Sequence, residues 1–484
     1  MKNLTQLTSE IAYEIFKNRD RRFDGLIFVG VTSTGIYCRP ICPAPPAKFE
    51  NCQFYNSVAL AEKDGFRPCL RCKPERSPHA YNSENLSDLV YRSIQKIEQA
   101  LDKDWNLEDL ANSLNVSSRH LRRCFVEDLG VTPVQFLRSI RLLRAKQLLS
   151  DTSLSLTEVA FASGFKSVRT FNETIKKQYK LKPSDMRKQQ RGETSPEKII
   201  ELKCGFRTPY DWASVLGYLK GRSNHAAELV KDGVYYRTVE LEAHRGWLSV
   251  ELNKKDQHLV ISISYSLHPV VSEVIARIKR QFDIHANPML INEVLGKSPI
   301  LKESVAANPG LRSPGSFDAF EMLVRVILGQ LISVKAATTL MNRFVEAYGQ
   351  PIATPVAELN RVSPTAKTIA TVDRDQLAGL GMQRKKAQTI IEVAKLFVSG
   401  ELDFSLSTDK EALKKRLIQT AGIGAWTVEY MLMRGVSWPD AFPSTDLGVQ
   451  KALGTKSKKE IEQIGLDWSP FRAYATQHLW RMIS

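Results

Sequence analysis

Four cysteines in two closely spaced pairs constrain the fold of this chain more than any other feature of its sequence. The first pair has Cys-x3-Cys spacing and the second has Cys-x2-Cys spacing, with enough chain between them for one small domain. Two such pairs suit the tetrahedral coordination of zinc by thiolates. We therefore expect the N-terminal segment to fold around one Zn2+ ion. The expected ligands are Cys38, Cys42, Cys69 and Cys72.

The composition describes a large and basic protein. Its 484 residues carry a net charge of +16, and 43% of them are hydrophobic. This length allows three or more domains with their own cores, and the charge suits a polyanion, with nucleic acid as the first expectation. No stretch is apolar enough to span a membrane and the N-terminus lacks a signal-peptide core, so we expect a cytoplasmic protein without a membrane partner. The odd count of 7 cysteines favours thiol or metal chemistry over a disulfide framework.

The residues around the paired cysteines resemble the N-terminal domain of the Ada-type methyltransferases. The resemblance is carried by Thr-Gly-Ile-Tyr-Cys-Arg-Pro at 34–40 and Phe-Arg-Pro-Cys at 66–69. In that family, the thiolate that matches Cys38 accepts a methyl group irreversibly from a methylphosphotriester in DNA. The resemblance implies that Cys38 is both ligand and acceptor, and that the other three cysteines are ligands only. Spacing by itself favours a purely structural zinc ion, and this alternative stays open.

Charge gives the methyl acceptor a consequence for DNA binding. Zinc with four thiolates carries two formal negative charges, and methylation of one sulfur removes one of them. Repulsion from DNA phosphates then weakens, so we expect the methylated protein to bind its specific DNA more tightly. Nearby basic residues are expected to hold the DNA backbone: Arg39, Arg67, Arg71 and Lys73. The remaining cysteines, Cys52, Cys124 and Cys204, are expected to be small buried hydrophobic residues.

Two helix-turn-helix patterns follow a polar linker near residues 74–85. The first has a helix at 107–114, a turn, and a basic helix from Ser118, and the second repeats this layout from Leu156. A long helix over 133–149 joins them. One such pattern fits a plain helical bundle equally well, but the tandem pair resembles the AraC-type DNA-binding domain. The resemblance implies one recognition helix from each copy in successive major grooves, with promoter DNA and RNA polymerase as partners.

Basic and hydroxyl residues at the start of each second helix are the expected base or phosphate contacts. In the first copy they are Ser118, Arg119, Arg122 and Arg123, and in the second they are Ser167, Arg169 and Thr170. Two helix-turn-helix units within one chain reduce the need to dimerise, so we expect a monomer.

The C-terminal segment begins with strands and continues with helices. Alternation in period two at 235–241, 247–252 and 259–265 predicts a small antiparallel sheet. Beyond Val270 the apolar spacing is helical, and one long apolar helix is expected over 317–333. Further helices are expected over 334–348, 384–399 and 410–420.

The stretch 420–453 concentrates residues suited to chemistry. Gly422 and Gly424 flank one apolar residue, which permits a tight turn with positive φ and exposed backbone N–H groups that can bind a phosphate. Trp426 and Tyr430 share one face of the next helix, which begins near residue 425, and Asp446 stands at the start of another helix. Each feature alone has an ordinary explanation, as an interhelical turn or as a helix cap.

Together, Gly-Ile-Gly-Ala-Trp-Thr at 422–427 and Phe-Pro-Ser-Thr-Asp-Leu-Gly at 442–448 resemble the helix-hairpin-helix DNA glycosylases of the AlkA 3-methyladenine type. The resemblance extends from about residue 198 to the C-terminus and includes Pro-Tyr-Asp at 209–211, Gly-Gln-Leu-Ile-Ser at 329–333 and His-Leu-Trp at 478–480. It implies that Leu331 is a wedge that fills the gap left by an extruded nucleotide, with Gln330 beside it. Core packing is the alternative for this pair. Ala421 departs from the Pro that such families place before the first hairpin glycine.

The resemblance implies hydrolysis of the N-glycosidic bond of an alkylated purine after base flipping. An N3- or N7-alkylated purine is a cation and a good leaving group, and Trp426, Tyr430 and Trp480 suit it by cation–π attraction. Asp446 either stabilises the developing oxocarbenium sugar or activates water, and we expect the first contribution to be larger. Residues 425–429 lack the lysine of β-lyases, so a monofunctional hydrolase is expected. The last cysteine is Cys204, so no iron–sulfur cluster is expected either.

These inferences combine into a multidomain protein, mainly α with α+β parts. A small four-cysteine zinc and methyl-acceptor domain is expected at 1–80, an AraC-type double helix-turn-helix domain at 81–191, a small antiparallel-sheet α+β subdomain at 197–282, and a helix-hairpin-helix glycosylase α domain at 283–484. A polar linker is expected at 191–196. The Pro-Cys-His-Arg centre of a second Ada transferase domain does not occur in the sequence, so repair of O6-methylguanine is not expected.

The expected function is adaptive-response DNA repair: excision of alkylated bases, methyl acceptance by Cys38 and transcriptional activation. Its expected partners are duplex DNA with alkylated bases, methylphosphotriester DNA, promoter DNA and RNA polymerase, in the nucleoid. Two alternatives stay open. One is a transcription regulator with an inactive glycosylase-like scaffold, and the other is a working glycosylase with a purely structural zinc domain.

Overall fold

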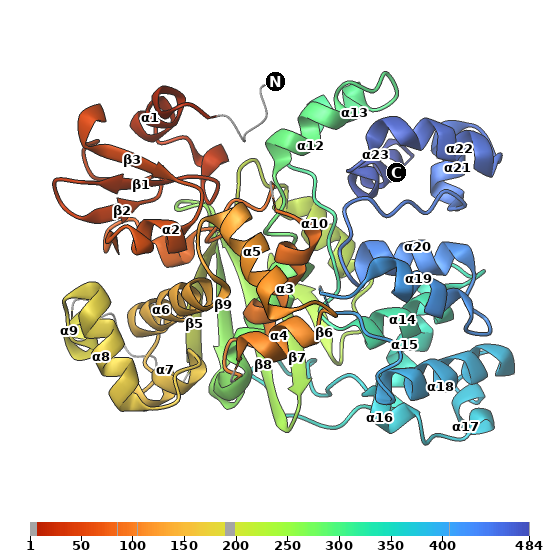
Figure 1. The fold of residues 1–484 in the computed structure, drawn as a ribbon. Coiled ribbons are helices and arrows are strands. Elements are labelled where there is room, and N and C mark those ends of the chain that lie inside the picture. The colour runs from red at the N-terminus through yellow and green to blue at the C-terminus, as the bar shows by residue number, and fades with distance from the viewer. Residues whose placement is uncertain (1–6, 85, 104, 189–198, 406, 484) are drawn as a thin grey trace. The chain divides into compact units, whose positions relative to one another are not determined.

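The computed structural model describes residues 7–84, 86–103, 105–188, 199–405 and 407–483 (Figure 1). The chain divides into two compact units. The first comprises Met1–Thr208 with Leu252–Ala276, and the second comprises Pro209–Glu251 with Arg277–Ser484. The linker expected at 191–196 lies outside the described residues. No helix in the described ranges combines the length and the apolar character needed to cross a membrane.

A four-stranded sheet in the order β3-β1-β2-β4 opens the first unit. Its strands are β1 (Phe28–Val31), β2 (Ile36–Cys38), β3 (Cys52–Tyr55) and β4 (Arg67–Pro68). β1 pairs antiparallel with β2 and β3, whereas β4 pairs parallel with β2. The short helical elements around it are α1 (Ser9–Lys17), η2 (Arg21–Phe23), η3 (Phe49–Asn51), α2 (Val58–Lys63) and η4 (Pro74–Arg76).

The sequence placed the first strand too early. The apolar run at residues 26–29, which ends at Gly30, predicts a strand at those positions, but β1 runs over Phe28–Val31 and includes that glycine. A Cβ at Gly30 would lie 2.8 Å from the ring of Tyr55 and 2.9 Å from that of Phe66. The glycine therefore makes room for two aromatic rings and does not end the strand.

The double helix-turn-helix layout is confirmed. Its helices are α3 (Asp88–Gln99), α4 (Leu107–Asn112), α5 (Ser118–Leu129), α6 (Pro133–Asp151), α7 (Leu156–Ala162), α8 (Val168–Tyr179) and α9 (Pro183–Lys188). The second helix of each copy buries three residues at the same spacing, which places them on one helix face. These triplets are Leu121, Phe125 and Leu129 in α5, and Phe171, Ile175 and Tyr179 in α8.

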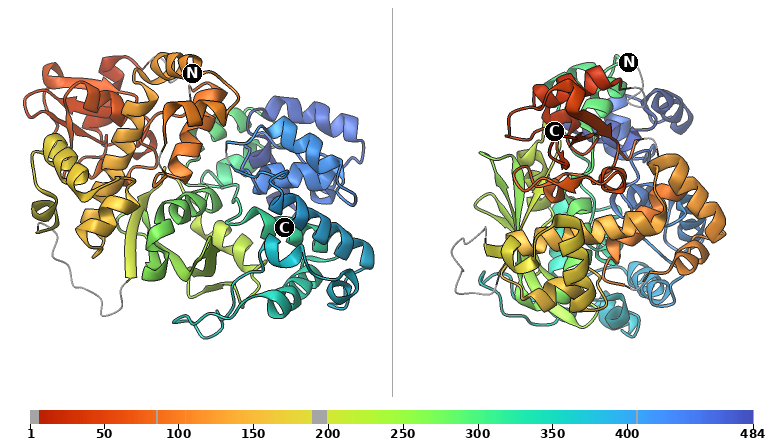
Figure 2. Two further views of the ribbon diagram at one scale, coloured as in Figure 1. Left: turned by 60° about the horizontal axis from the view of Figure 1, so that its bottom comes forward. Right: turned by 60° about the vertical axis from the view of Figure 1, so that its left-hand side comes forward.

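Helix α6 packs against both the zinc segment and the second helix-turn-helix (Figure 2). Lys146 of α6 forms an ion pair with Glu75, and both side chains are 1% exposed. The Lys146 ammonium also donates to the carbonyl of Cys69. A buried pair of this kind leaves a costly unpaired charge if either partner is removed. The long helix is therefore fixed directly to the loop that carries the second cysteine pair.

Antiparallel strands follow in both units. In the first unit, β5 (Ile199–Gly205) pairs with β9 (His258–Ser264). In the second, β6 (Glu228–Lys231), β7 (Val234–Leu241) and β8 (His244–Asn253) form consecutive antiparallel pairs. The three strands that alternation predicted are confirmed as β7, β8 and β9. Strands β5 and β6 were not predicted from the sequence.

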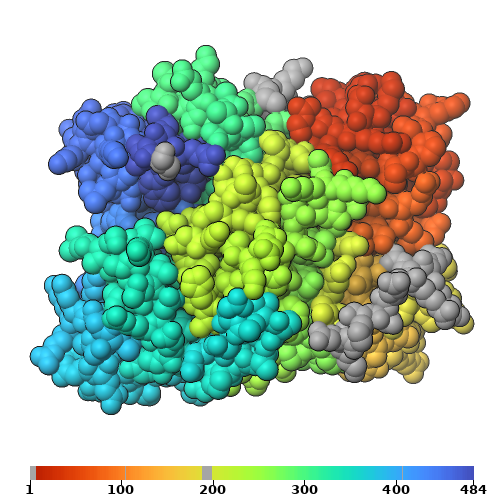
Figure 3. Space-filling model, turned by 180° about the vertical axis from the view of Figure 1, so that it is seen from behind, coloured from red at the N-terminus to blue at the C-terminus, as the bar shows by residue number. Residues whose placement is uncertain are grey.

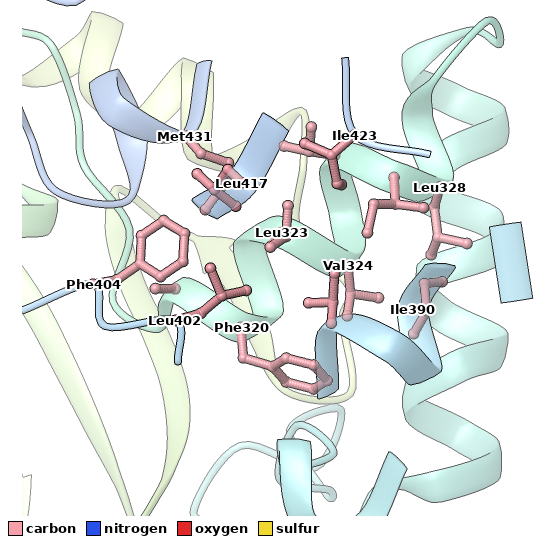
Figure 4. Packing of buried hydrophobic residues seen from close by; sticks show 14 of the residues in the cluster. Phe320, Leu323, Val324, Leu328, Ile390, Leu402, Phe404, Leu417, Ile423 and Met431 are labelled. Carbon is pink, nitrogen blue, oxygen red and sulfur yellow. The ribbon is translucent and has the colours of Figure 1, made fainter. Parts of the chain in front are cut away.

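The C-terminal helices surround α14, whose apolar side chains form the centre of a core (Figure 4). Phe320, Leu323 and Val324 of α14 pack with Ile390 and Leu417 from two other helices. Figure 3 shows the space-filling surface from behind. The helical elements are α10 (Trp212–Lys220), η5 (Tyr265–Val270), α11 (Val271–Gln281), α12 (Pro288–Leu295), α13 (Lys302–Ala307), α14 (Ala319–Gly329), α15 (Val334–Tyr348), α16 (Ala366–Ile369), α17 (Arg374–Ala378), α18 (Arg384–Val398), α19 (Lys410–Ile418), α20 (Ala425–Arg434), α21 (Leu447–Leu453), α22 (Lys458–Gly465), η6 (Leu466–Trp468) and α23 (Arg472–Met482).

The apolar helix expected over 317–333 is shorter than the sequence indicated. Asp318 caps α14 by accepting from the backbone N–H of Glu321 at 2.9 Å, and the helix ends at Gly329. The next helix, α15, begins at Val334 as expected. The segment between them is the break on which the wedge hypothesis depends.

Candidate active site and metal centre

The hairpin between α19 and α20 depends on Gly422. Its φ is 85°, and a Cβ there would lie 2.2 Å from Oγ1 of Thr389. That hydroxyl donates to the carbonyl of Ala421 at 3.1 Å, which fixes the turn to α18. Gly424 has a φ of −98° and is the N-cap of α20, so only one of the two glycines needs the left-handed region. Both glycines are exposed, as a phosphate-binding turn requires.

The break after α14 presents Leu331 to solvent. Its side chain is 103% exposed and its φ is 60°. Lys386 holds the break by donating to the carbonyls of Leu328 at 2.8 Å and Gln330 at 2.7 Å. The Gln330 amide donates to the carbonyl of Gly422 at 3.2 Å, which joins the break to the hairpin. Core packing is therefore wrong for Leu331.

Asp446 is both a helix cap and a partner of two indoles. Its Oδ1 accepts from the backbone N–H of Gly448 at 2.8 Å and of Val449 at 3.1 Å, which caps α21. The same oxygen accepts from Nε1 of Trp480 at 2.8 Å, and Oδ2 accepts from Nε1 of Trp426 at 2.9 Å. These four donors fix the orientation of the carboxylate. Oδ2 has a single donor and therefore the larger remaining capacity to accept.

The three aromatic residues singled out from the sequence form one cluster beside this carboxylate. The ring centroids of Trp426 and Tyr430 are 5.2 Å apart, and those of Tyr430 and Trp480 are 6.3 Å apart. Two of these rings belong to α20 and the third belongs to α23. Their faces carry negative electrostatic potential, which suits a flat cation. The structure thus brings together an acid and three rings that are separated by up to 54 positions in the chain.

Two arginines and a tyrosine that the sequence analysis missed lie against this cluster. The guanidinium carbon of Arg434 is 4.3 Å from the ring centroid of Tyr218, 5.8 Å from that of Tyr430 and 5.6 Å from that of Trp480. The guanidinium carbon of Arg222 is 4.2 Å from the Tyr218 centroid. Burial alone would raise the pKa of Tyr430, but the charges of Arg434 and Arg222 outweigh it and lower that pKa. Burial raises the pKa of Tyr218 to about 12.

A signal for Tyr218 was present in the Pro-Tyr-Asp run that precedes it. Asp211 caps α10 by accepting from the N–H of Ser214 at 2.9 Å, and the Tyr210 hydroxyl donates to the Phe282 carbonyl at 2.6 Å. These contacts fix the helix that carries Tyr218. The motif therefore positions a residue two turns further along, which local reading of the motif did not reveal.

The loop that leads to Asp446 is fixed at two points. Glu429 of α20 accepts from the N–H of Phe442 at 3.2 Å and pairs with Lys414 at 2.6 Å. Arg472 donates to both carboxylate oxygens of Asp440 at 2.7 Å. A bidentate pair of this kind is geometrically specific. The acid is thus positioned by helices on both sides of its loop.

His478, part of the His-Leu-Trp run at 478–480, is a buried residue of α23. Its Nδ1 lies 3.0 Å from Oγ of Ser304. Burial, together with the charge of Arg481, lowers the pKa of His478 to about 4. The imidazole is therefore neutral at pH 7 and serves packing of the terminal helix.

The four paired cysteines meet in one buried cluster. Cys38 ends β2 and Cys69 follows β4, and because these strands are parallel, the chain leaves both at the same end. The four sulfurs lie within 4.8 Å of one another. Tetrahedral zinc at a Zn–S distance of about 2.3 Å needs sulfurs about 3.8 Å apart, so the set fits zinc after slight contraction. Backbone N–H groups point at two sulfurs, from Arg39 to Cys72 at 3.3 Å and from Arg71 to Cys69 at 3.4 Å, as thiolates require.

Burial does not distinguish Cys38 from two of its neighbours. Cys38 is 7% exposed, Cys69 is 6% and Cys72 is 7%, whereas Cys42 is 1% exposed. Of the other cysteines, only Cys204 is buried as expected. The expectation was wrong for Cys52 and Cys124, which are half-buried.

Arg39 does not face outward as the sequence analysis expected. It is 7% exposed, forms a buried ion pair with Asp24, and donates to the carbonyl of Cys72 at 3.1 Å. Its charge is therefore already paired inside the domain. Arg71 is exposed, and Arg67 and Lys73 are half-buried.

The expected DNA-contacting residues occupy the exposed sides of both recognition helices. Arg119, Arg122 and Arg123 are exposed on α5. On α8, Arg169 is exposed and lies 3.0 Å from Glu173. Ser167 is the N-cap of α8, accepting from the N–H of Thr170 at 3.1 Å, so part of its hydrogen-bonding capacity is used within the helix. Ser118 is the first residue of α5 and is half-buried.

Comparison with known proteins assigns a family to each segment. The metal binding domain of Ada matches residues 12–75, and a helix-turn-helix domain matches 110–189. The AlkA N-terminal domain matches 201–318, and the HhH-GPD superfamily of base excision DNA repair proteins matches 324–464. The four-cysteine cluster lies within the first of these matches.

Relatives cover both the whole chain and its C-terminal part. A probable bifunctional transcriptional activator/DNA repair enzyme AlkA from Mycobacterium tuberculosis (strain H37Rv) is 33% identical over 480 residues, which cover 97% of this chain and 96% of the relative. DNA-3-methyladenine glycosylase 2 from Escherichia coli is 34% identical over 275 residues, or 57% of this chain and 95% of the relative. The structure of a 3-methyladenine DNA-glycosylase from Archaeoglobus fulgidus has the same fold over 58% of this chain and 99% of its own, with a TM-score of 0.52 at 20% identity. The chain therefore belongs to the family of bifunctional transcriptional activator/DNA repair enzymes in which an Ada-type metal-binding domain and a helix-turn-helix domain are joined to an AlkA-type glycosylase.

Proposed function

We propose that this protein hydrolyses the N-glycosidic bond of alkylated purines in duplex DNA and that Asp446 is its catalytic carboxylate. The observation that carries the proposal is the pair of indole N–H groups, from Trp426 at 2.9 Å and Trp480 at 2.8 Å, that hold Asp446 at the edge of the aromatic cluster. A flipped cationic base that stacks on these rings places its sugar near the carboxylate. An acid used only as a cap has no need of two indole partners.

The reaction follows from this arrangement. Leu331 enters the gap in the duplex while the hairpin at Gly422 and Gly424 binds a phosphate. The C1′–N bond breaks, its electron pair leaves with the base, and the sugar becomes an oxocarbenium ion. Asp446 stabilises that positive charge. Water then adds to C1′ and loses a proton, which leaves an abasic site.

Product analysis tests this proposal. Wild-type protein is incubated with N-methylated duplex DNA, and unmethylated duplex of the same sequence is the control. We expect free 3-methyladenine and 7-methylguanine, and abasic sites that break only after alkali treatment. Absence of base release would favour the regulator with an inactive scaffold, and strand breakage without alkali would contradict a monofunctional reaction.

We also propose that Cys38 accepts a methyl group from DNA methylphosphotriesters. In this proposal Cys38 binds zinc together with Cys42, Cys69 and Cys72. Bound zinc keeps the sulfurs as thiolates at neutral pH. The Cys38 sulfur attacks the methyl carbon, an S–C bond forms, the O–CH3 bond breaks, and the phosphodiester leaves as an anion. The buried contact between Lys146 and the Cys69 carbonyl supports a link to regulation, because it joins the cysteine cluster to α6, the long helix between the two helix-turn-helix units.

Mass analysis of peptides tests the acceptor. After incubation with methylphosphotriester DNA, we expect one added methyl group on Cys38 and none on Cys124, which is half-buried and lies outside the cluster. A cluster that stays unmethylated would support a purely structural zinc ion.

The regulatory part of the proposal uses both recognition helices. We propose that Arg119, Arg122 and Arg123 of α5 and Ser167 and Arg169 of α8 contact promoter DNA, and that a bound monomer recruits RNA polymerase in the nucleoid. Three exposed arginines on one helix and an exposed arginine on the other support it. Footprinting of wild type and an Arg122→Ala variant tests it, because the variant is expected to lose protection of one half of the site only. The segments 1–80, 81–191, 197–282 and 283–484 are the proposed functional divisions of the chain.

A further inference from the structure

Arg434 is a fully buried cation whose direct hydrogen-bond acceptors are neutral. It is 0% exposed, and it donates to the carbonyl of Pro314 at 2.5 Å and to Oε1 of Gln477 at 2.9 Å. Its Nε has no hydrogen-bond partner in the described part of the chain. A charge buried in this way is expensive to keep. This cost indicates that the charge has a role at the neighbouring aromatic cluster.

The helix α20 arranges the cluster between two opposite charges. Trp426, Tyr430 and Arg434 are spaced four residues apart, so they form one row along a helix face about 12 Å long. Asp446 binds the Trp426 end of that row, at 2.9 Å, and Arg434 is the other end. Trp480 contacts both charges: its Nε1 lies 2.8 Å from Asp446, and its ring centroid lies 5.6 Å from the guanidinium carbon.

We propose that Arg434 determines the rate and substrate preference of base excision through its charge, without touching the base. This inference rests on the proposed glycosylase reaction. When the C1′–N bond breaks, the electron pair moves onto the base and positive charge moves onto the sugar. A base that stacks on the cluster lies against the rings of Tyr430 and Trp480, which Arg434 also approaches, and its sugar lies near Asp446. The cation and the carboxylate therefore stabilise the same shift of charge.

The charge of the lesion separates this role from a structural one. A base that is already cationic, such as 7-methylguanine, is repelled by Arg434 in the ground state, whereas a neutral base such as hypoxanthine is not. Both kinds of base gain one electron pair in the transition state. Neutralising Arg434 is therefore expected to slow the chemical step but to tighten binding of the cationic lesion only. The lowered pKa of Tyr430 agrees with a field of this sign in the cluster.

The experiment compares Arg434→Met, which removes the charge at similar size, with Arg434→Lys, which keeps it. Rates come from single-turnover release of 7-methylguanine, and affinities come from competition by duplexes that carry one 7-methylguanine or one hypoxanthine. For Arg434→Met we expect a rate about tenfold lower and an affinity for 7-methylguanine duplex severalfold higher, with the hypoxanthine affinity unchanged. Arg434→Lys is expected to recover most of the rate.

Equal weakening of both affinities, or a loss that Arg434→Lys does not recover, would show that Arg434 only supports the fold. Thermal melting shows whether each variant is folded. If Arg434→Met does not fold, Arg222→Gln takes its place, because Arg222 lies over Tyr218 and is less buried. For this variant we expect the affinity for 7-methylguanine duplex to rise about threefold and the affinity for hypoxanthine duplex to stay unchanged. Equal changes in the two affinities would overturn the proposal. Failure of wild type to release any base would contradict the glycosylase reaction itself, before any variant is compared.

Discussion

Leu331 combines an exposed apolar side chain with a backbone conformation that leucine disfavours. Its side chain is 103% exposed and its φ is 60°, where a non-glycine residue carries strain of roughly 1–3 kcal/mol. Lys386 and Gln330 hold the break on either side through their hydrogen bonds to backbone carbonyls. A position that is costly for folding in two ways is best explained by a role in binding.

Replacing this residue separates stability from activity. Leu331→Gly relieves the positive φ and removes no buried side chain, so we expect the free energy of unfolding to rise by about 1 kcal/mol. Excision is expected to fall about tenfold or more, because the flipped nucleotide loses its wedge. Thermal melts and single-turnover base release measure the two effects. Val398→Ala, at another exposed apolar position, is the matched control and should leave excision unchanged.

The residues that the sequence identified are those with a local motif. Asp446, Trp426 and Leu331 stand in short runs that could be read without the fold. Arg434 could not be found in this way, because its importance depends on Tyr218 and Trp480, which come from distant helices. Arg39 was misread for the opposite reason: its motif was recognised, but its buried partner Asp24 lies on another segment.

Among the elements, α6 connects the zinc segment to both helix-turn-helix units. Its Lys146 pairs with Glu75 and donates to Cys69, and its Ser139 donates to Glu62 of α2 at 2.6 Å. The contacts of Lys146 are buried and that of Ser139 is half-buried, so each partner depends on the other. The segment that carries the second cysteine pair is therefore in direct contact with the helix that joins the two helix-turn-helix units.

Removing the buried cation of α6 should expose this dependence. Lys146→Met leaves Glu75 buried without its ion-pair partner, and we expect a loss of about 3 kcal/mol in the free energy of unfolding. Adding Glu75→Gln should recover most of that loss because it removes the uncompensated charge. Urea unfolding of the two variants and wild type measures both. If Lys146→Met alone is as stable as wild type, the ion pair between Lys146 and Glu75 contributes nothing to stability.

The contact between α2 and α6 also predicts a pH dependence. Burial raises the pKa of Glu62 to about 7, although the hydroxyls of Ser139 and Tyr37 donate to it. The folded state therefore holds this proton more tightly than the unfolded state, and stability falls as pH rises from about 4.5 to about 7. Between pH 5.5 and pH 8 we expect wild type to lose about 2 kcal/mol more than Glu62→Gln. Parallel urea series that show the same slope for both proteins would contradict this.

The elements themselves were predictable where periodicity was strong. The helices α15, α18 and α19 begin where the apolar spacing placed them, and α20 begins directly after the glycine turn as expected. The errors arose where packing overrides local pattern, as at Gly30, which makes room for aromatic rings inside β1, and at Asp318, which starts α14 later than its apolar run. β6, only four residues long, gave too short a run to distinguish from a loop.

At the scale of the whole molecule, the net charge of +16 provides general affinity for DNA. Within this background, we expect one charge on the cysteine cluster to change the affinity measurably. Methylation of Cys38 removes one negative charge, so affinity for specific DNA is expected to rise roughly threefold at moderate salt. Anisotropy titrations of methylated and unmethylated protein, at matched salt, measure this. Protein treated with unmethylated DNA is the control, and equal affinities would refute the electrostatic switch.

The central claim is that one carboxylate, held by two indoles, makes this molecule a glycosylase. The most direct test is the single-turnover rate of 7-methylguanine release by wild type and by Asp446→Asn, with Asp467→Asn as an exposed control on the same unit. We expect Asp446→Asn to lose about 100- to 1000-fold in rate while it stays folded and bound to DNA, and Asp467→Asn to match wild type. An Asp446→Asn protein that releases base at the wild-type rate would contradict the account.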